Sequence, residues 1–235
     1  MNHSSFSIII PAYNEERYLG KTIAAVHDTM KAVNIHSYEI IVCDDGSSDR
    51  TSQIAREMGA IVTCSDKRHI AAARNKGAKL AHGEYLIFLD ADTLMNPKTA
   101  SAMLQALQKG AVGGGALIKS IERLPPRVQV TLNAWNRISS FLNVAAGAFI
   151  FLPKKIFIQI GGFDEQYYAG EEWYFSKKVK KIGRFVILRE PIETSARKLE
   201  DHSACELYLF LLKWIFMGQR ILNNKKELEF WYAKT

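Results

Sequence analysis

The sequence predicts an α/β fold in which a mostly parallel sheet is flanked by helices, with a helical extension at the C-terminus. Short apolar runs alternate with segments of helical spacing through residues 6–110, the pattern of a layered domain with a parallel sheet. The chain has 235 residues and a hydrophobic content of 48%, enough for one sizeable core. Acidic clusters directly follow three of the apolar runs, and ligands bind where parallel strands end.

Residues 6–110 are interpreted as strands and helices in alternation. The strand over 6–10 is a β-branched run that we expect to stop at Pro11. Apolar residues recur at helical spacing over 14–33, which predicts a helix. The other expected strands cover 38–43, 60–64 and 85–89, and the other expected helices cover 51–58, 70–81 and 97–109.

Beyond residue 110 the alternation loosens. Gly113, Gly114 and Gly115 follow a helix rather than a strand, so we interpret them as a linker turn. Strands are expected over 117–121, 148–152 and 185–188, and helices over 128–142 and 171–182.

The formal net charge of +7 favours polyanionic partners, which include anionic lipid, phosphorylated small molecules and nucleic acid. Basic motifs interleaved with aromatics are not evident, so nucleic acid is not expected. Cys43 and Cys64 lie in apolar runs and are expected in the core, which fits a reducing cytosol. We see neither a signal peptide nor an apolar run of membrane-spanning length. The expectation is a cytoplasmic protein that is soluble or peripherally attached.

Three polar clusters stand where the expected strands end: residues 11–15, Asp44-Asp45-Gly46 and Asp90-Ala-Asp92. Carboxylates gathered at one sheet edge repel each other unless a cation or ligand offsets them, and oxygen ligands suit Mg²⁺ or Mn²⁺. One Asp-x-Asp alone is often only turn or capping chemistry. Its occurrence with the other clusters favours a site. Because the glycine-rich phosphate-binding motifs are missing, metal and side chains would have to hold a phosphate.

Six blocks of the sequence form a recognisable set. They are Ser-Ile-Ile-Ile-Pro-Ala-Tyr-Asn-Glu-Glu at 7–16, Val-Cys-Asp-Asp-Gly-Ser-Ser-Asp at 42–49, Ala-Arg-Asn-Lys-Gly at 73–77, Phe-Leu-Asp-Ala-Asp at 88–92, Gly-Gly-Phe-Asp-Glu at 161–165 and Gly-Glu-Glu-Trp at 170–173. Together they resemble family 2 glycosyltransferases. The blocks stand in the family's order and cover roughly residues 6–190, so the resemblance is specific.

This resemblance implies a Rossmann-like GT-A fold, a UDP- or GDP-sugar donor, Mg²⁺ or Mn²⁺, and inversion at the anomeric carbon. It places a GT-A domain over 1–200, with a nucleotide-binding half over about 1–112 and an acceptor half over about 113–200, before a helical extension over 201–235. The implied donor-binding residues are Pro11, Ala12, Tyr13, Glu15, Asp44 or Asp45, Arg74 and Asp90, and the implied metal ligands are Asp90 and Asp92.

In the family's acidic pair after the Gly-Gly-Phe-Asp-Glu block, the second residue usually acts as the base. Here it is Glu172, where Asp is more usual, and Glu171 is the fallback. A base works best with a pKa raised by burial or a neighbouring charge, for which Trp173 and Glu171 are the local candidates.

The segment Thr-Ser-Ala-Arg-Lys at 194–198 resembles a Ser-x-Arg element found in one branch of the family. His202, further along, is a candidate metal ligand by resemblance to other GT-A enzymes. The competing interpretation, an exposed histidine in a charged loop, is favoured.

Residues 207–217 are apolar except for Lys213, and basic and aromatic residues follow. This pattern suits an interfacial helix on anionic lipid at the inner face of the membrane. The alternative is a helix docked on the core or on a second subunit of a homodimer. The acceptor, a carbohydrate or a lipid-linked molecule, is not revealed by the sequence.

Two other functions compete with transfer of a sugar. A sugar nucleotidyltransferase should open with a glycine-rich, basic loop after the first strand, and residues 11–16 are neither. A catalytically inactive module that binds a nucleotide-sugar stays open, because Glu172 departs from the family's usual Asp.

Overall fold

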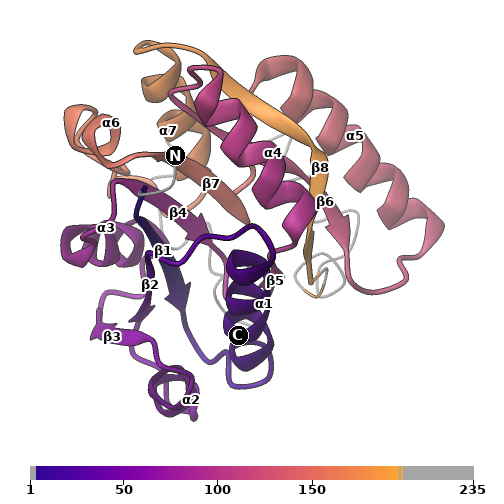
Figure 1. Ribbon diagram of the computed structural model, residues 1–235. Helices are drawn as coiled ribbons and strands as arrows, with labels where there is room; N and C mark the ends of the chain where they lie inside the picture. Colours follow the sequence, from indigo (N-terminus) through magenta and orange to yellow (C-terminus); the bar gives the residue numbers. More distant parts are fainter. Residues whose placement is uncertain (1–3, 196, 198–235) are drawn as a thin grey trace.

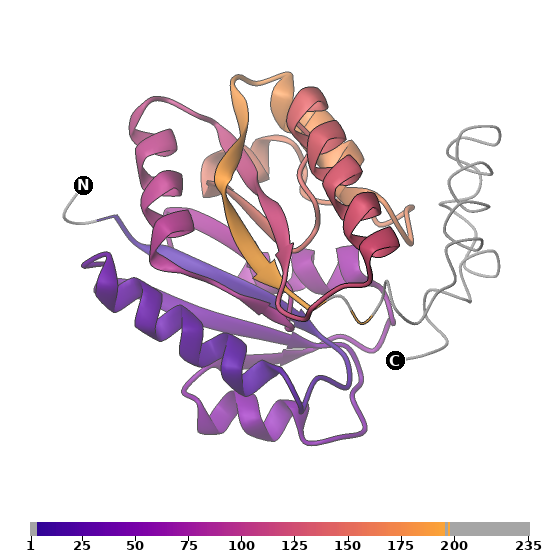
Figure 2. The same cartoon turned by 90° about the vertical axis from the view of Figure 1, so that its right-hand side faces the viewer.

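The computed structural model describes residues 4–195 and 197. One sheet runs through the molecule, and helices lie on both of its faces (Figures 1 and 2). The strands are β1 Phe6–Ala12, β2 Tyr38–Asp44, β3 Ile61–Cys64, β4 Tyr85–Leu89, β5 Thr93–Leu94, β6 Gly113–Ser120, β7 Phe149–Pro153 and β8 Phe185–Thr194. The helices are α1 Leu19–Ala32, α2 Thr51–Glu57, α3 Ile70–Leu80, α4 Pro97–Gln108, α5 Pro126–Leu142, α6 Lys154–Gln159 and α7 Glu171–Lys180.

The sheet has eight strands in the order β3-β2-β1-β4-β7-β6-β8-β5. Among the described strands only β5 and β7 run against the others, because β7 is antiparallel to β4 and β6, and β5 is antiparallel to β8. The remaining pairs are parallel. The carboxyl ends of β1, β2, β4, β6 and β8 therefore lie along one edge, and the predicted mostly parallel α/β sheet is confirmed.

Apolar residues of the strands form two layers, one on each face of the sheet. In β1, Ile8 and Ile10 pack with residues of α1, α2 and α4, whereas Ile9 packs with residues of α3, α6 and α7. This alternation follows from the period of two in a strand, and it explains why β1 is apolar throughout. Because the central strands are buried on both faces, the positions of their ends are fixed. The loops that follow them therefore start from fixed positions at the edge of the sheet.

The interpretation of residues 113–115 as a linker turn is wrong, because β6 begins at Gly113. A Cβ on Gly114 would lie 2.6 Å from the ring of Phe151, and one on Gly115 would lie 2.6 Å from the Cβ of Ala145. Neighbouring side chains and backbone approach β6 so closely that only glycine, which has no Cβ, fits at these positions.

Most expected elements agree with the observed ones within a few residues, with differences at the first helix and in β1. β1 continues through Pro11 to Ala12, and α1 begins at Leu19 rather than at residue 14. Residues 14 and 15 instead bind the chain after β2: the Asn14 amide donates to Ser47 Oγ at 2.9 Å and the Glu15 amide to Thr51 Oγ1 at 2.7 Å.

Three further details differ from the expectations. Cys43 is buried as expected, but Cys64 is exposed because β3 is an edge strand. The short elements α6 and β5 were not expected, and β8 extends well beyond the expected end at residue 188.

The surface shows no sign of a membrane-spanning element in the part that the structure describes. None of the described helices combines the length and the apolar character needed to cross a bilayer.

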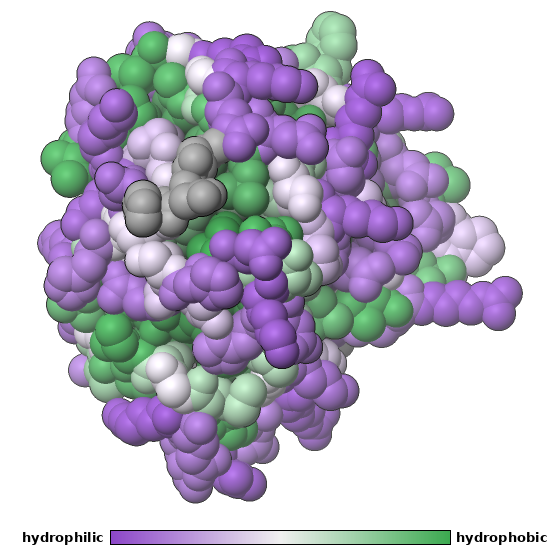
Figure 3. All heavy atoms as spheres, in the orientation of Figure 1, coloured by the Kyte–Doolittle hydropathy of each residue, from purple (hydrophilic) through white to green (hydrophobic). Residues whose placement is uncertain are grey.

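On the face in Figure 3, hydrophilic side chains surround separate hydrophobic patches. The expected extension over 201–235, with its apolar run, lies outside the described residues.

Candidate active site

Asp44, at the end of β2, closes the turn that leads to α2. Its Oδ1 accepts a hydrogen bond from the Ser47 amide at 2.9 Å, and its Oδ2 accepts one from the Ser52 hydroxyl. The carboxylate is buried. In this structure its oxygens are engaged in the turn, which is the ordinary structural use of an aspartate after a strand.

Asp45 holds the loop that precedes α3. Its carboxylate accepts hydrogen bonds from the backbone amides of Lys67 and Arg68, each at 3.1 Å, and of His69 at 2.5 Å. Its own amide donates to the carbonyl of Ala12 at 2.8 Å. Asp45 therefore contacts the end of β1 through its amide and the basic loop through its buried carboxylate.

Two residues of this basic loop were not predicted as site residues. The Arg68 guanidinium lies 3.8 Å over the ring of Tyr13, a cation–π arrangement. His69 is buried, caps α3 by accepting from the Ala72 amide, and packs 4.5 Å from the ring of Tyr168. The sequence signal for them is a basic stretch between a strand and a helix.

Arg74 is buried and links the end of β4 to the start of α7. Its Nη2 donates to Asp90 Oδ1 at 2.9 Å, and its Nη1 donates to Glu171 Oε1 at 2.5 Å. We call Arg74, Asp90 and Glu171 the Arg74 cluster. It places the carboxylate that follows β4 next to the acidic pair at the start of α7, although these segments are about 80 residues apart in the sequence.

The surroundings of Arg74 fix its guanidinium in one position. Nη2 also donates to the carbonyl of Gly147 at 3.0 Å, and the guanidinium carbon lies 5.3 Å from the ring centre of Phe163. Burial acts to lower the pKa of Arg74, but the charges of Asp90 and Glu171 outweigh burial and the pKa is raised. The guanidinium is therefore permanently charged and positions both carboxylates.

Glu172, the predicted base, has a raised pKa. It is the second residue of α7, whose N-cap is Gly170 in the left-handed conformation with φ 68°. Burial, and then the neighbouring charge of Glu171, raise the pKa of Glu172 to about 8, while Arg74 acts in the opposite direction. A carboxyl group with such a pKa exchanges its proton near neutral pH, as a general base requires.

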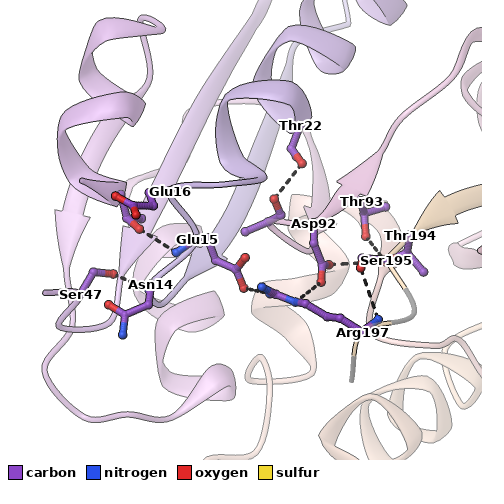
Figure 4. Close-up of polar contacts among 12 residues, drawn as sticks. Asn14, Glu15, Glu16, Thr22, Ser47, Asp92, Thr93, Thr194, Ser195 and Arg197 are labelled. Atoms are coloured by element: carbon purple, nitrogen blue, oxygen red, sulfur yellow. Dashed lines mark hydrogen bonds and ion pairs between the residues drawn. The ribbon is translucent and has the colours of Figure 1, made fainter. Parts of the chain in front are cut away.

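The second aspartate of the Asp-x-Asp motif binds a different arginine. Asp92 Oδ2 lies 3.3 Å from Arg197 Nε, and Arg197 Nη2 donates to Glu15 Oε1 (Figure 4). We call Arg197, Asp92 and Glu15 the Arg197 cluster. It joins the loops that follow β1, β4 and β8 at the carboxyl edge of the sheet.

Neighbouring groups orient the Arg197 cluster. Arg197 packs 4.7 Å over the ring of Tyr18, and its amide donates to the Ser195 hydroxyl at 3.3 Å. Ser195 in turn donates to Glu122 Oε1 at 2.9 Å. The Ser-x-Arg element is visible in the sequence, but its contact with Asp92 is not predictable from it, because the partners are about 100 residues apart.

The aspartate pair fits a hard divalent cation in its chemistry. Among the described residues no group of three or more histidine, cysteine or acidic side chains is arranged to bind a metal. Mg²⁺, however, commonly binds one or two carboxylates and completes its shell with substrate phosphates and water. Asp90 and Asp92 supply such carboxylates, and the side chain of Asp90 is 24% exposed. They therefore fit an ion that arrives with a phosphate.

The predicted site residues collect at one edge of the sheet. Pro11 and Ala12 are buried in β1, and Tyr13 lies at its end. The candidate metal ligand His202 lies outside the described residues. The residues brought to this edge are Tyr13, Glu15, Asp44, Asp45, Arg74, Asp90, Asp92, Glu171 and Glu172.

A sequence model of glycosyl transferase family 2 matches residues 7–161, the segment that carries β1, β2, β4 and both aspartates of the Asp-x-Asp motif. The chain belongs to glycosyl transferase family 2. The family member extends the same sheet through β8, beyond the matched segment.

Curated relatives of this family member carry glycosyltransferase names. Dolichol-phosphate mannosyltransferase of Pyrococcus furiosus is 29% identical over 110 residues, which are 45% of this chain and 30% of that protein. Glycosyltransferase AglE of Haloferax volcanii is 27% identical over 200 residues, which are 75% of this chain and 62% of that protein. The chain thus spans less than two thirds of the length of either relative.

Solved structures share the fold. Mannosyltransferase PcManGT of Pyrobaculum calidifontis, in complex with GDP-Man and Mn²⁺, has a TM-score of 0.65 at 17% identity and covers 83% of this chain and 57% of its own. Staphylococcus aureus TarS 1-349, in complex with UDP-GlcNAc, has a TM-score of 0.63 at 20% identity and covers 81% of this chain and 58% of its own. The expected GT-A fold is confirmed.

Proposed function

We propose that this family 2 glycosyltransferase moves a sugar from a nucleoside diphosphate donor to an acceptor hydroxyl, with inversion at the anomeric carbon. The observation that carries the proposal is the Arg74 cluster. By binding both Asp90 and Glu171, Arg74 keeps the Asp-x-Asp motif beside the acidic pair of α7. A carboxylate pair for a diphosphate-bound cation and a base for the acceptor are then neighbours, as direct displacement requires.

The donor is proposed to lie along the ends of β1, β2 and β4. PcManGT with GDP-Man and TarS with UDP-GlcNAc support a nucleotide-sugar of this kind. Tyr13 and Arg68 offer an aromatic ring and a cation at the end of β1, next to the loop held by Asp45. The nucleotide-binding half is proposed to cover about residues 1–112, and the acceptor half about 113–200.

Asp90 and Asp92 are proposed to hold Mg²⁺ or Mn²⁺. Such an ion would offset the negative charge that builds on the departing diphosphate. The contribution of the protein is to fix the ligands: Arg74 orients Asp90, and the hydroxyl of Thr194 donates to Asp92 Oδ1 at 3.4 Å.

Glu172 is proposed to accept the proton of the attacking hydroxyl. Glu171 is less suited, because its carboxylate is committed to the ion pair with Arg74. The raised pKa of Glu172 makes its carboxylate a stronger base than an ordinary glutamate. With the base on the acceptor side and the leaving diphosphate on the other, a single displacement inverts the anomeric carbon.

The acceptor is proposed to be a carbohydrate or a lipid-linked molecule that meets the donor at the half over 113–200. Contact with the inner face of a membrane, and the role of the C-terminal extension in it, stay predictions. So does the formation of a homodimer.

The test is release of nucleoside diphosphate from UDP- and GDP-sugars in the presence of Mn²⁺ or Mg²⁺. We expect Asp92→Asn to lower turnover by about 10²–10³-fold through lost charge stabilisation. Glu172→Gln should lower it by about 10²–10⁴-fold through loss of the base.

Exposed carboxylates provide matched controls for this test. Asp28→Asn on α1 and Glu190→Gln on β8 make the same chemical changes at exposed positions and should retain turnover. Unchanged turnover in Asp92→Asn or Glu172→Gln would remove that residue from the chemistry. Donor binding without any turnover in the unmodified protein would instead favour an inactive binding module.

A further inference from the structure

Arg197 places a positive charge on the same carboxylate that is proposed to bind the divalent ion. Its Nε lies 3.3 Å from Asp92 Oδ2, and its Nη2 donates to Glu15 (Figure 4). A guanidinium between two carboxylates satisfies the charge requirement that a metal ion would otherwise meet. The two cations cannot share Asp92 Oδ2 without strong repulsion at contact distance.

The environment of Arg197 allows it to leave. Its side chain is 25% exposed, whereas that of Arg74 is 1% exposed. Arg197 follows β8 in the sequence, and its guanidinium contacts Glu15, Asp92 and Tyr18. Movement of this guanidinium away from Asp92 would remove the ion pair at Oδ2.

We propose that Arg197 competes with the divalent cation for Asp92 and passes to the diphosphate of the donor when the cation binds. This inference rests on the proposed function, since it assumes a diphosphate at this edge. A guanidinium offers a planar fork of donors that matches phosphate oxygens, so the transfer replaces one charge-assisted contact with another. Arg197 thereby makes the binding of metal and donor mutually dependent.

The consequence is a coupling between two ligands. Without a nucleotide, Arg197 holds Asp92 and weakens metal binding. With a nucleoside diphosphate, Arg197 has a second anion to bind, and Asp92 becomes available to the ion. Because linkage is reciprocal, Mn²⁺ must strengthen nucleotide binding by the same factor by which the nucleotide strengthens Mn²⁺ binding.

The experiment measures Mn²⁺ affinity by the electron paramagnetic resonance signal of the unbound ion, with and without UDP or GDP. It compares the unmodified protein with Arg197→Gln, with Arg197→Lys and with Arg189→Gln, whose arginine is exposed on β8. Removal of the competing cation should tighten Mn²⁺ binding without nucleotide by about tenfold in Arg197→Gln, within the usual range of coupling effects. Nucleotide affinity in the presence of Mn²⁺ should fall in the same variant.

The coupling factor separates competition from a simple charge effect. A charge effect alone would tighten Mn²⁺ binding equally with and without nucleotide and leave the coupling unchanged. Competition predicts that the factor by which nucleotide tightens Mn²⁺ binding falls by about tenfold in Arg197→Gln, and falls less in Arg197→Lys. Arg189→Gln should behave as the unmodified protein. A cooperative thermal unfolding transition with an unchanged midpoint temperature would show that each variant is folded.

Equal Mn²⁺ affinities and equal coupling in all the proteins would overturn the competition while leaving the proposed function intact. If the unmodified protein and every variant bind neither Mn²⁺ nor UDP or GDP, the proposed function fails together with the inference.

Discussion

The Arg74 cluster and the Arg197 cluster have the same composition but very different surroundings. Each consists of an arginine between two carboxylates, and each uses one aspartate of the Asp-x-Asp motif. The Arg74 side chain is almost completely buried, and it also binds the carbonyl of Gly147 and packs on Phe163. Arg197 lies at the rim of the same edge and packs on Tyr18.

The difference indicates a division of roles between the two aspartates of the Asp-x-Asp motif. A buried charged group that loses its partner costs several kcal/mol, so the Arg74 cluster has to stay assembled. The Arg197 side chain is 25% exposed, so water can solvate its guanidinium more readily than that of Arg74, although its partners Asp92 and Glu15 are buried. We therefore assign Asp90 to the fixed frame of the site, and we propose that Asp92 changes its partner when ligands bind.

The largest expected effect is on the Arg74 cluster. Arg74→Met leaves Asp90 and Glu171 without their buried counter-charge, so the free energy of unfolding should fall by about 3–5 kcal/mol. Urea denaturation followed by circular dichroism measures it. Arg197→Met is the matched control, and equal losses in the two variants would contradict the comparison.

The next largest expected effect is the contribution of Glu172 to the pH dependence of stability. Its pKa is raised from 4.5 to about 8 on folding, so the folded state binds the proton more tightly than the unfolded state between these pH values. Its contribution to stability is therefore fully present below about pH 4.5 and is lost as the pH rises through about 8.

Thermal unfolding between pH 4 and pH 9 measures this contribution. Glu172→Gln should show a flatter dependence on pH than the unmodified protein. Turnover of the unmodified protein should rise over the same range, as the carboxyl group ionises to act as the base. An identical pH dependence of unfolding in the two proteins would show that Glu172 has an ordinary pKa.

Gly147→Ala provides a smaller test of how rigidly Arg74 is held. A Cβ at this position would lie 2.9 Å from Arg74 Nη2, which is fixed by Asp90 and the Gly147 carbonyl. We expect a loss of about 1–3 kcal/mol in the free energy of unfolding, as in other overpacked sites. In an Arg74→Met background the added methyl should cost much less, and additive losses would show that the two groups do not interact.

The smallest expected effect is on the Arg197 cluster. Arg197→Gln should lower the free energy of unfolding by about 1 kcal/mol, because the Arg197 side chain is 25% exposed, although its partners Asp92 and Glu15 are buried. Urea denaturation beside Arg189→Gln measures the difference. A loss as large as that in Arg74→Met would mean that Arg197 is a fixed structural residue.

Local patterns in the sequence predict most of the fold. Isoleucine-rich runs predict β1, and glycines and a proline predict the ends of α2 and α4. The glycines of β6 were misinterpreted, because their role depends on Phe151 and Ala145, which approach only in the folded chain. The same limit applies to the site: Asp92 was predicted from its motif, but its contact with Arg197 depends on how β8 joins the sheet.

The most direct test is a crystal of the protein with Mn²⁺ and either UDP or GDP, measured for the anomalous scattering of manganese. The account predicts a manganese peak within bonding distance of Asp92, with the diphosphate beside it and Arg74 still bound to Asp90 and Glu171. A diphosphate bound away from the ends of β1, β2 and β4, or manganese absent from Asp92 while the diphosphate is bound, would contradict it.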